Sequence, residues 1–391
     1  VKTALRPLAV LQVLPFLILL ALVPEFCRGE DATTPLPAET RLRAHVELLA
    51  SPAFAGRRGP GARKTAAYLV DAFQSLHLEP AFGDSYLQDI PGEEPGTILG
   101  RNVAATLEGS DPDLKEEYVL VTAHYDHLGV RDGVLYPGAD DNASGTAMML
   151  ELARCFASMK QRPRRSLMFV GFDLEEYGLW GSRHFAEHPP IPLEDIKLFL
   201  TADMVARSLG GVCKSYLFVM GSEHAPELRA WVNQAAEGLP LTLGIVGSDL
   251  LFFDRSDYGP FRERKVPYLF FSTGENPRYH TPRDTPETLD YKHLEAVARM
   301  VEKIVREAAN ADSVPSWSPE PDHPFGEAVV LRDVLNLLLE HRDELEMKPL
   351  SVALIRAQIK TLSAVIERGT ITPSERQRML RGAQVILYSV L

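Results

Sequence analysis

Cysteine is scarce in this sequence, with only three residues in a chain of 391. Cys27 lies at the edge of an apolar N-terminal stretch, which leaves Cys155 and Cys213 for the folded part of the chain. Two thiols could form one disulfide, but a domain of this size can bury a hydrophobic core and does not need one. We therefore expect both thiols to be buried and reduced.

Basic residues are also fewer than acidic residues. The chain carries 41 Lys and Arg against 53 Asp and Glu, which gives a formal net charge of -12 at pH 7. Because nucleic-acid-binding surfaces are basic, this balance argues against nucleic acid as a partner. The sequence has no polybasic run that would suggest anionic lipid. It also has no internal repeat, so a repeat architecture is not expected.

The longest apolar run lies at the N-terminus. Lys2 and Arg6 precede or flank a nearly uninterrupted apolar stretch at residues 7–23, and polar residues follow it. This pattern is typical of an export signal, here residues 1–30, and predicts a periplasmic or extracellular protein. A single-span membrane anchor at residues 7–23 is the alternative, although the run is somewhat short for a bilayer. Without such an anchor we expect no stable membrane partner.

The remaining chain alternates between strand-like and helix-like segments. Its apolar content of 45% and charged content of 24% are ordinary for a globular protein. The alternation predicts a doubly wound α/β domain over residues 31–310, with helices on both faces of the sheet. The predicted strands are 102–107, 118–123, 165–172, 198–202, 216–219 and 267–271, and the predicted helices are 41–50, 62–78, 143–159, 178–187 and 288–309.

A helical appendage is predicted after this domain. Residues 311–324 contain four prolines among polar residues and are predicted to be a linker. The segment 325–391 then carries three helical patterns whose apolar faces are rich in Leu, Ile and Val, at 329–345, 350–368 and 374–387. These faces cannot stay in water, so we expect the appendage to dock on the α/β domain, with a dimer contact as the second choice.

Acidic residues and histidines follow the ends of several predicted strands. His124 and Asp126 follow the strand 118–123, and Asp203 follows the strand 198–202. In an open α/β sheet, ligands gather at the carboxyl ends of the strands. Because imidazole and carboxylate groups are the ligands that divalent metals prefer, the sequence predicts a metal site there. Further candidates of this kind are Asp140, Asp141, Glu175, Glu176 and His280.

Glu175 and Glu176 form an adjacent pair of acids. Such pairs repel each other and usually mark a solvated turn. Here the pair directly follows a buried strand and lies in a loop bounded by glycine. In that setting one metal ligand beside one proton carrier is the better interpretation.

Taken in order, the chain carries H-x-D, G-A-D-D-N-A-S-G, E-E-x-G-L-x-G-S, D-M and Y-H-T-x-x-D. This combination, over about residues 41–309, resembles the dinuclear zinc exopeptidases that include the bacterial leucyl aminopeptidases and aminopeptidase Y. The resemblance implies a mixed β-sheet with helices on both faces and two zinc ions as cofactors. It also implies an aminopeptidase that hydrolyses the N-terminal peptide bond of peptide substrates.

The resemblance further implies roles for single residues. Asp141 would bridge both metals, and its link to Asn142 would be a cis peptide bond. Glu175 would be the general base that takes a proton from a water activated by both metals and returns it to the leaving amine. The expected zinc ligands are His124 with Asp203, Glu176 with His280, and the shared Asp141.

Two other residues receive supporting roles from the resemblance. Asp126 would orient the ring of His124. Tyr279 would donate to the oxyanion, as in some relatives, or would only pack beside His280. A wider group is expected to be mostly structural or to support the ligands: His127, Asp140, Asp173, His184 and Asp284.

The chain departs from the family pattern in three places. Tyr258 stands where many relatives have His, which puts only local substrate contacts in doubt. There is no long insertion between Asp84 and Asn102, where many relatives carry a protease-associated domain. The three C-terminal helices lie outside the resemblance, so their role is open.

Other functions remain as alternatives. A dizinc carboxypeptidase or an N-acyl amino acid amidohydrolase would use the same metals. A carboxypeptidase would need an arginine at the substrate carboxylate, for which Arg207, Arg255 and Arg278 are available. A non-catalytic, receptor-like relative is disfavoured by the intact ligand set and Glu175. A cyclase of N-terminal glutamine, a single-zinc chemistry, is disfavoured by the complete two-metal set.

Overall fold

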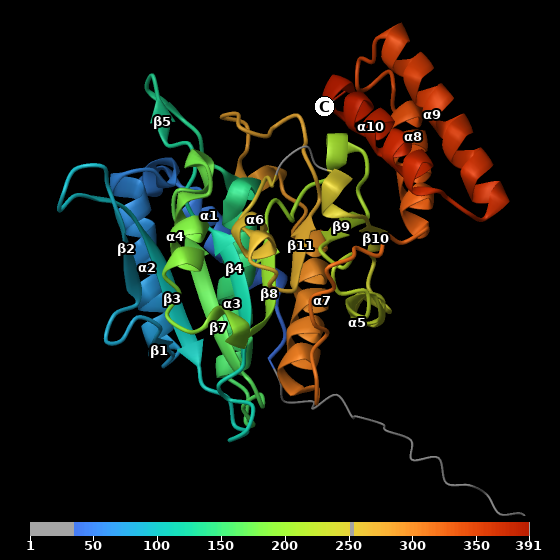
Figure 1. Cartoon of the computed structure of the whole chain (residues 1–391). Coiled ribbons are helices and arrows are strands. Elements are labelled where there is room, and N and C mark those ends of the chain that lie inside the picture. Colours follow the sequence, from blue (N-terminus) through green and yellow to red (C-terminus); the bar gives the residue numbers. More distant parts are fainter. Residues whose placement is uncertain (1–34, 251–253, 391) are drawn as a thin grey trace, which may run out of the picture. The chain divides into compact units, whose positions relative to one another are not determined.

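The computed structural model describes residues 35–250 and 254–390 (Figure 1). The predicted export signal at residues 1–30 lies outside the described residues. The described chain is built on a nine-stranded mixed sheet. Its strands are β1 (Glu79–Pro80), β2 (Leu87–Pro91), β3 (Ile98–Leu107), β4 (Tyr118–His124), β7 (Ser166–Phe172), β8 (Ile196–Ala202), β9 (Tyr216–Met220), β10 (Thr242–Ile245) and β11 (Tyr268–Ser272).

The strand order across the sheet is β1-β3-β7-β4-β8-β11-β9-β10, with β2 paired to β3. The central strands β7, β4, β8 and β11 run parallel to one another, whereas β3 and β9 join this block in antiparallel pairs. A separate hairpin is formed by β5 (Val130–Arg131) and β6 (Val134–Leu135). The carboxyl ends of the parallel strands therefore lie at one edge of the sheet, where ligand sites form in such folds.

Helices cover both faces of the sheet, which confirms the predicted fold class. One face packs against α1 (Glu39–Leu49), α2 (Pro60–Ser75), α3 (Gly145–Ala157), α5 (Leu228–Ala236) and α7 (Tyr291–Asn310). The other face packs against α4 (Trp180–Glu187) and α6 (Tyr258–Glu263), which cross in front of the sheet in Figure 1. A strand buried on both faces needs an almost continuous apolar run, and this is what β4 and β7 contain.

Strand β4 shows how the sequence divides these two cores. Val119 and Val121 pack on the face of α1 and α3, and Leu120 packs on the face of α4 and α6. This follows from the alternation of side chains along a strand. The β-branched residues also favour the extended backbone. The strand ends at His124, whose side chain is thereby fixed at the edge of the sheet.

Helix α3 begins later than its sequence pattern predicts. The prediction placed the helix start at residue 143, but residues 139–144 form an irregular turn in which Asp141 and Asn142 are not helical. The regular helix starts at Gly145. The short strands β2 and β10 and the helix α5 were not predicted; the two strands lie at the margin of the sheet, where only a few residues carry the strand pattern.

The three predicted C-terminal helices are present as α8 (Gly326–Glu340), α9 (Pro349–Arg368) and α10 (Pro373–Val390), here called the C-terminal helical unit. The predicted docking on the α/β domain is confirmed. Leu331 and Val334 of α8 belong to the same hydrophobic cluster as Phe218 and Met220 of β9. Among the described helices, α9 alone is long and apolar enough to span a membrane. Its buried residues contribute to the three-helix packing: Ile355, Leu362 and Val365.

Candidate metal centre

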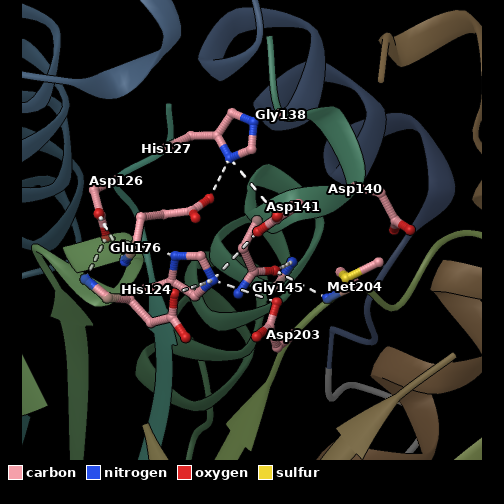
Figure 2. Close-up of polar contacts among 12 residues, drawn as sticks. His124, Asp126, His127, Gly138, Asp140, Asp141, Gly145, Glu176, Asp203 and Met204 are labelled. Atoms are coloured by element: carbon pink, nitrogen blue, oxygen red, sulfur yellow. Dashed lines mark hydrogen bonds and ion pairs between the residues drawn. The ribbon is translucent and has the colours of Figure 1, made fainter. Parts of the chain in front are cut away.

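A cluster of carboxylates and imidazoles lies at the carboxyl edge of the parallel strands (Figure 2). His124 ends β4, and Asp203 follows β8 directly. Glu175 and Glu176 begin a short 3₁₀ turn after β7. The cluster is completed by Asp141, from the irregular turn before α3, and by His280, from the loop after β11. The five sequence-predicted ligands and Glu175 are therefore brought together in one place.

The first group of side chains centres on His124. Its Nε2 lies 3.3 Å from Asp203 Oδ1 and 3.5 Å from Asp141 Oδ1. Glu175 Oε2 lies slightly farther from the same nitrogen, at 4.0 Å. His124, Glu175 and Asp203 can place three ligand atoms within 4.8 Å of one another, so geometry alone also admits Glu175 as a ligand here.

The second group centres on Glu176. His280 Nε2 lies 3.0 Å from Glu176 Oε2 and 3.1 Å from Asp141 Oδ2. His127 Nδ1 lies 2.7 Å from Glu176 Oε1 and 3.7 Å from Asp141 Oδ2. His127, Asp141 and Glu176 also satisfy the geometry of a metal-binding group. Two imidazoles thus face the same pair of carboxylates.

His127 was expected to be structural or to support the ligands, and the structure places its ring against one of the predicted ligands, Glu176. The structure buries it fully and aims its Nδ1 at Glu176, while its Nε2 has no hydrogen-bond partner among the described residues. The available signal was its position three residues after His124 in the same loop.

Asp141 joins the two groups. Its Oδ1 faces His124 and its Oδ2 faces His280. A carboxylate whose two oxygens point at different imidazoles has the arrangement required to bridge two metal ions. The Asp141–Asn142 peptide bond is cis, as the family resemblance led us to expect. Asn142 ties this turn to β8, because its Nδ2 donates to the carbonyl of Ala202 at 2.8 Å.

The electrostatics of the cluster fit bound cations. Burial raises the pKa of Asp141, and the negative charge of Glu176 raises it further, while His127 and His280 oppose the shift. Burial raises the pKa of Glu175 well above its ordinary value; His124 opposes this, and Asp203 adds to it. Crowded, buried carboxylates either take up protons or bind a cation. The mixed nitrogen and oxygen donors suit a transition metal of the zinc type.

Asp126 connects the segment that carries His124 with the turn that carries Glu175 and Glu176. Its Oδ1 accepts a hydrogen bond from the backbone N–H of Glu175 at 3.0 Å, and its Oδ2 accepts one from Glu176 at 3.3 Å. The same Oδ1 lies 3.5 Å from Nδ1 of His124. Asp126 thus faces the ring that it was expected to orient, and it also fixes the backbone of the two glutamates.

Arg57 supports the loops of the centre from a buried position, a role that was not predicted from the sequence. Its side chain is fully buried, and its guanidinium donates only to backbone carbonyls in the described contacts. These bonds include 2.8 Å to Tyr125, next to His124, and 3.0 Å to Asp141. The sequence signal was only a Gly- and Arg-rich break. A guanidinium with five donors is suited to join several loops in this way.

Asp284 supports the turn that carries Asp141. Its carboxylate accepts hydrogen bonds from the backbone N–H groups of Asp140, at 3.0 Å, and Asp141, at 3.1 Å. Arg207 Nη2 lies 2.8 Å from Asp284 Oδ1. Burial and the neighbouring charge of Asp284 raise the pKa of Asp140 to about 8. Asp140 Oδ1 accepts a hydrogen bond from the backbone N–H of Ala206 at 2.8 Å, so Asp140 and Asp284 both hold backbone near the centre. His184 of α4 instead packs its ring against His188, which follows that helix.

Tyr279 lies beside His280, with the ring centroids 3.8 Å apart in a stacked arrangement. The same tyrosine lines a cavity that opens on Glu175, Asp203 and His280. Burial raises the pKa of its hydroxyl above the ordinary value. A protonated phenol at this position can donate a hydrogen bond to a substrate in the cavity.

Comparisons with known proteins agree with this architecture. Residues 102–305, more than half of the chain, match the model described as Peptidase family M28. Aminopeptidase YwaD of Bacillus subtilis is 29% identical over 206 residues, which cover 51% of this chain and 43% of that protein. The chain therefore spans less than half the length of this relative.

Solved structures share the fold at low sequence identity. The LapA aminopeptidase of Legionella pneumophila has a TM-score of 0.54 at 20% identity, covering 70% of this chain and 72% of that one. The glutaminyl cyclase of Porphyromonas gingivalis has a TM-score of 0.57 at 22% identity, covering 70% and 99%. At such identities the similarity describes the fold and does not separate the two activities.

Proposed function

The chain belongs to peptidase family M28, and from this premise we propose that it is a zinc-dependent aminopeptidase that removes N-terminal residues from peptides. The observation that carries the proposal is the position of Asp141. Its two carboxylate oxygens face His124 and His280, and each imidazole also faces a further carboxylate, from Asp203 or Glu176. This arrangement supplies two adjacent metal positions that share one ligand.

We assign His124, Asp203 and Asp141 to the first zinc, and Glu176, His280 and Asp141 to the second. His280 is preferred over His127 because its Nε2 lies within 3.1 Å of both carboxylates, whereas His127 is close to Glu176 but 3.7 Å from Asp141. In this assignment His127 holds Glu176 in place. When bound, a pair of zinc ions lowers the pKa of a water molecule and polarises a carbonyl group.

Glu175 is assigned to proton transfer. Each proposed metal position has three ligands without it, and Asp141 is closer than Glu175 to His124. Its carboxylate lines the cavity beside the proposed metal positions, 4.0 Å from His124, where it can accept a proton from water and then give it to the leaving amine. Its backbone N–H is held by Asp126, so the turn that carries it is fixed.

Tyr279 is assigned to the substrate carbonyl. It lines the cavity beside His280, and its hydroxyl stays protonated because burial raises its pKa. A hydrogen bond from this hydroxyl would stabilise the negative charge that develops on the carbonyl oxygen. No metal-binding role is needed for it.

The arginines that a carboxypeptidase would need are already engaged. Arg207 is bonded to Asp284, and Arg255 forms an ion pair with Glu275. Arg278 donates to the backbone carbonyl of Arg283. Each of the three arginines therefore has a partner within the protein, and none is left to bind only the carboxylate of a substrate. This favours cleavage at the amino terminus of a peptide over cleavage at its carboxy terminus.

A substrate panel tests the proposal. Purified zinc-loaded protein would be assayed on peptides with a free N-terminus, matched N-acetylated peptides, N-acyl amino acids and peptides that begin with glutamine. We expect release of the first residue from the free peptides alone, with loss of activity in a chelator and recovery with zinc. Cleavage only at the C-terminus or of N-acyl compounds, or cyclisation of glutamine, would replace the proposed activity with that alternative.

We also propose that the protein is exported through residues 1–30. The support is the sequence pattern of a basic start followed by an apolar run. Fractionation of the producing cells and sequencing of the mature N-terminus would test this. A mature chain that begins near residue 31 outside the cytoplasm is expected, whereas an intact, membrane-bound chain would favour the anchor at residues 7–23.

A further inference from the structure

A cavity of about 190 Å³ extends from the metal centre to the C-terminal helical unit. At one end it is bounded by Asp141, Glu175 and Asp203. At the other end the two helices α8 and α10 contribute lining side chains, namely Leu331, Val334, Gln384 and Leu387. The helices that lie outside the family resemblance therefore share a cavity with the residues proposed to carry the chemistry.

The walls between these two ends are mostly apolar. They include Met204, Leu209, Phe218, Met220 and Phe270. The cavity is smaller than the roughly 300–1,000 Å³ typical of pockets for drug-sized ligands. It is therefore suited to one apolar side chain rather than to a whole peptide. If the first carbonyl group of a bound peptide lies beside the carboxylates of the metal centre, the side chain of its first residue is close enough to enter this cavity.

We propose that the C-terminal helical unit forms the far wall of the pocket that receives the side chain of the substrate's N-terminal residue. Leu331, Val334 and Leu387 thereby determine specificity and select large apolar side chains. This inference rests on the proposed aminopeptidase activity and gives the helical unit a role in substrate choice. Burial of apolar surface, at about 25 cal/mol per Å², supplies the preference for a large side chain over a small one.

The wall is held firmly against the α/β domain. Glu327 of α8 accepts a hydrogen bond from the backbone N–H of Gly247 at 2.8 Å and one from Arg376 of α10 at 2.7 Å. Gln384 Nε2 donates to the carbonyl of Leu250 at 3.0 Å. A wall fixed in this way can discriminate between side chains, because little ordering is required when substrate binds.

Substitutions that change the pocket volume test the proposal in the full-length, zinc-loaded protein. Val334→Phe should narrow the pocket, and Leu331→Ala should widen it. Leu354→Ala is the matched control, because this α9 side chain is 40% exposed and does not line the cavity. For each variant, kcat and KM would be measured on otherwise identical alanyl, leucyl and phenylalanyl substrates, together with Tm.

We expect Val334→Phe to lower the leucyl-to-alanyl ratio of kcat/KM by about tenfold or more, since one methylene in an apolar pocket changes discrimination by roughly 10–200-fold. Leu331→Ala should raise the phenylalanyl-to-leucyl ratio. The change should lie mainly in KM, and the control should keep the wild-type ratios. If the wall residues served only the stability of the fold, their variants would change Tm but keep these kcat/KM ratios within twofold of the wild type. That result would overturn the proposal.

A binding measurement separates failure of this inference from failure of the proposed function. Calorimetric titration with free L-leucine and L-alanine reports on the pocket without any turnover. If the wild type cleaves no free peptide but binds leucine more tightly than alanine, and Val334→Phe removes that difference, the aminopeptidase assignment fails and the apolar wall stands. If neither binding nor turnover depends on the wall residues, the wall proposal is wrong.

Discussion

Arg57 Nη2 donates a hydrogen bond to the backbone carbonyl of Asp141 at 3.0 Å, and the same guanidinium reaches the carbonyl of Tyr125. One buried cation thus connects the segments that carry two of the proposed metal ligands, His124 and Asp141. It does so without a carboxylate partner in the described contacts. The position of those ligands therefore depends on a residue that touches neither metal position.

Replacing Arg57 with Met should destabilise the protein and weaken metal binding. The change leaves several buried carbonyls without donors, and we expect a loss of at least about 3 kcal/mol in the free energy of unfolding. Arg57→Lys should rescue little, since an ammonium cannot reproduce the planar fork. Denaturant unfolding and zinc titration would measure both effects. Arg63→Met, an exposed arginine on α2, is the control and should change neither.

Changing Glu175 to Gln should abolish proton transfer while leaving the metals bound. General acid–base catalysis is typically worth about 10²–10⁴-fold, so kcat should fall at least that far with little change in KM. Glu176→Gln should instead lower zinc affinity, with activity partly restored by added metal. Steady-state kinetics with metal analysis of each variant would separate them. A Glu175→Gln protein that loses its zinc would reverse the two assignments.

Asp141→Ala should lose both zinc ions, because this carboxylate is proposed to serve both positions. His280→Ala and His124→Ala should each weaken mainly one ion. Zinc content per chain, measured after equilibration at controlled free zinc, gives the answer directly. Two ions are expected in the wild type, and a wild-type value of one or none would exclude the two-metal proposal.

His127→Ala provides a separate check on the second metal position. If His127 only holds Glu176, its loss should weaken that ion less than the loss of His280 does. Equal or greater zinc loss in His127→Ala would make His127 the ligand. The comparison is well matched, because both rings face Glu176 and lie 5.8 Å apart between centroids.

Ending the chain after Pro324 should expose the apolar surface now covered by the C-terminal helical unit. Phe218 and Met220 of β9 would lose the packing of Leu331 and Val334. We expect lower solubility, stronger binding of a hydrophobic dye and a lower Tm than in the full chain. A truncated protein as soluble and as stable as the full chain would show that the docking contributes nothing to the fold.

The two thiols of the described domain should be unreactive in the native protein. Burial raises the pKa of both Cys155 and Cys213 to about 12. Both are free and buried, which confirms the expectation from the sequence. In a Cys27→Ser variant, Ellman's reagent at pH 8 should find no fast-reacting thiol, and two after denaturation. A thiol count of zero after denaturation would instead indicate a disulfide.

Much of the site was predictable because its residues follow strand ends. The run Tyr118–Ala123 predicted β4, and the strand places His124 at the sheet edge without any further information. The same reasoning located Asp203 and the pair Glu175–Glu176. Strand identity depends on local residue pattern, and the carboxyl ends of parallel strands share one edge, so position in the sequence was enough to bring these residues together.

Other features depended on contacts between distant segments. Arg57 gave no periodic or motif signal, and its role is visible only where its guanidinium meets three separate segments, at Leu49, Tyr125 and residues 137–141. The late start of α3 at Gly145 also departs from its helical pattern, because Asp141 and Asn142 have non-helical backbone and are held by Asp284 and Ala202. Local propensity cannot report such tertiary constraints.

By itself, the sequence determined the class of fold, the order of its main elements and the set of side chains gathered at the sheet edge. These properties follow from hydrophobic periodicity and from residue types at fixed spacing. The tertiary structure alone decided that His127 also reaches Glu176, that Arg57 connects the segments of His124 and Asp141, and that Leu331 and Val334 close a cavity beside Glu175. Each of these is a long-range contact, whose geometry is set by packing of the whole chain rather than by neighbours in the sequence.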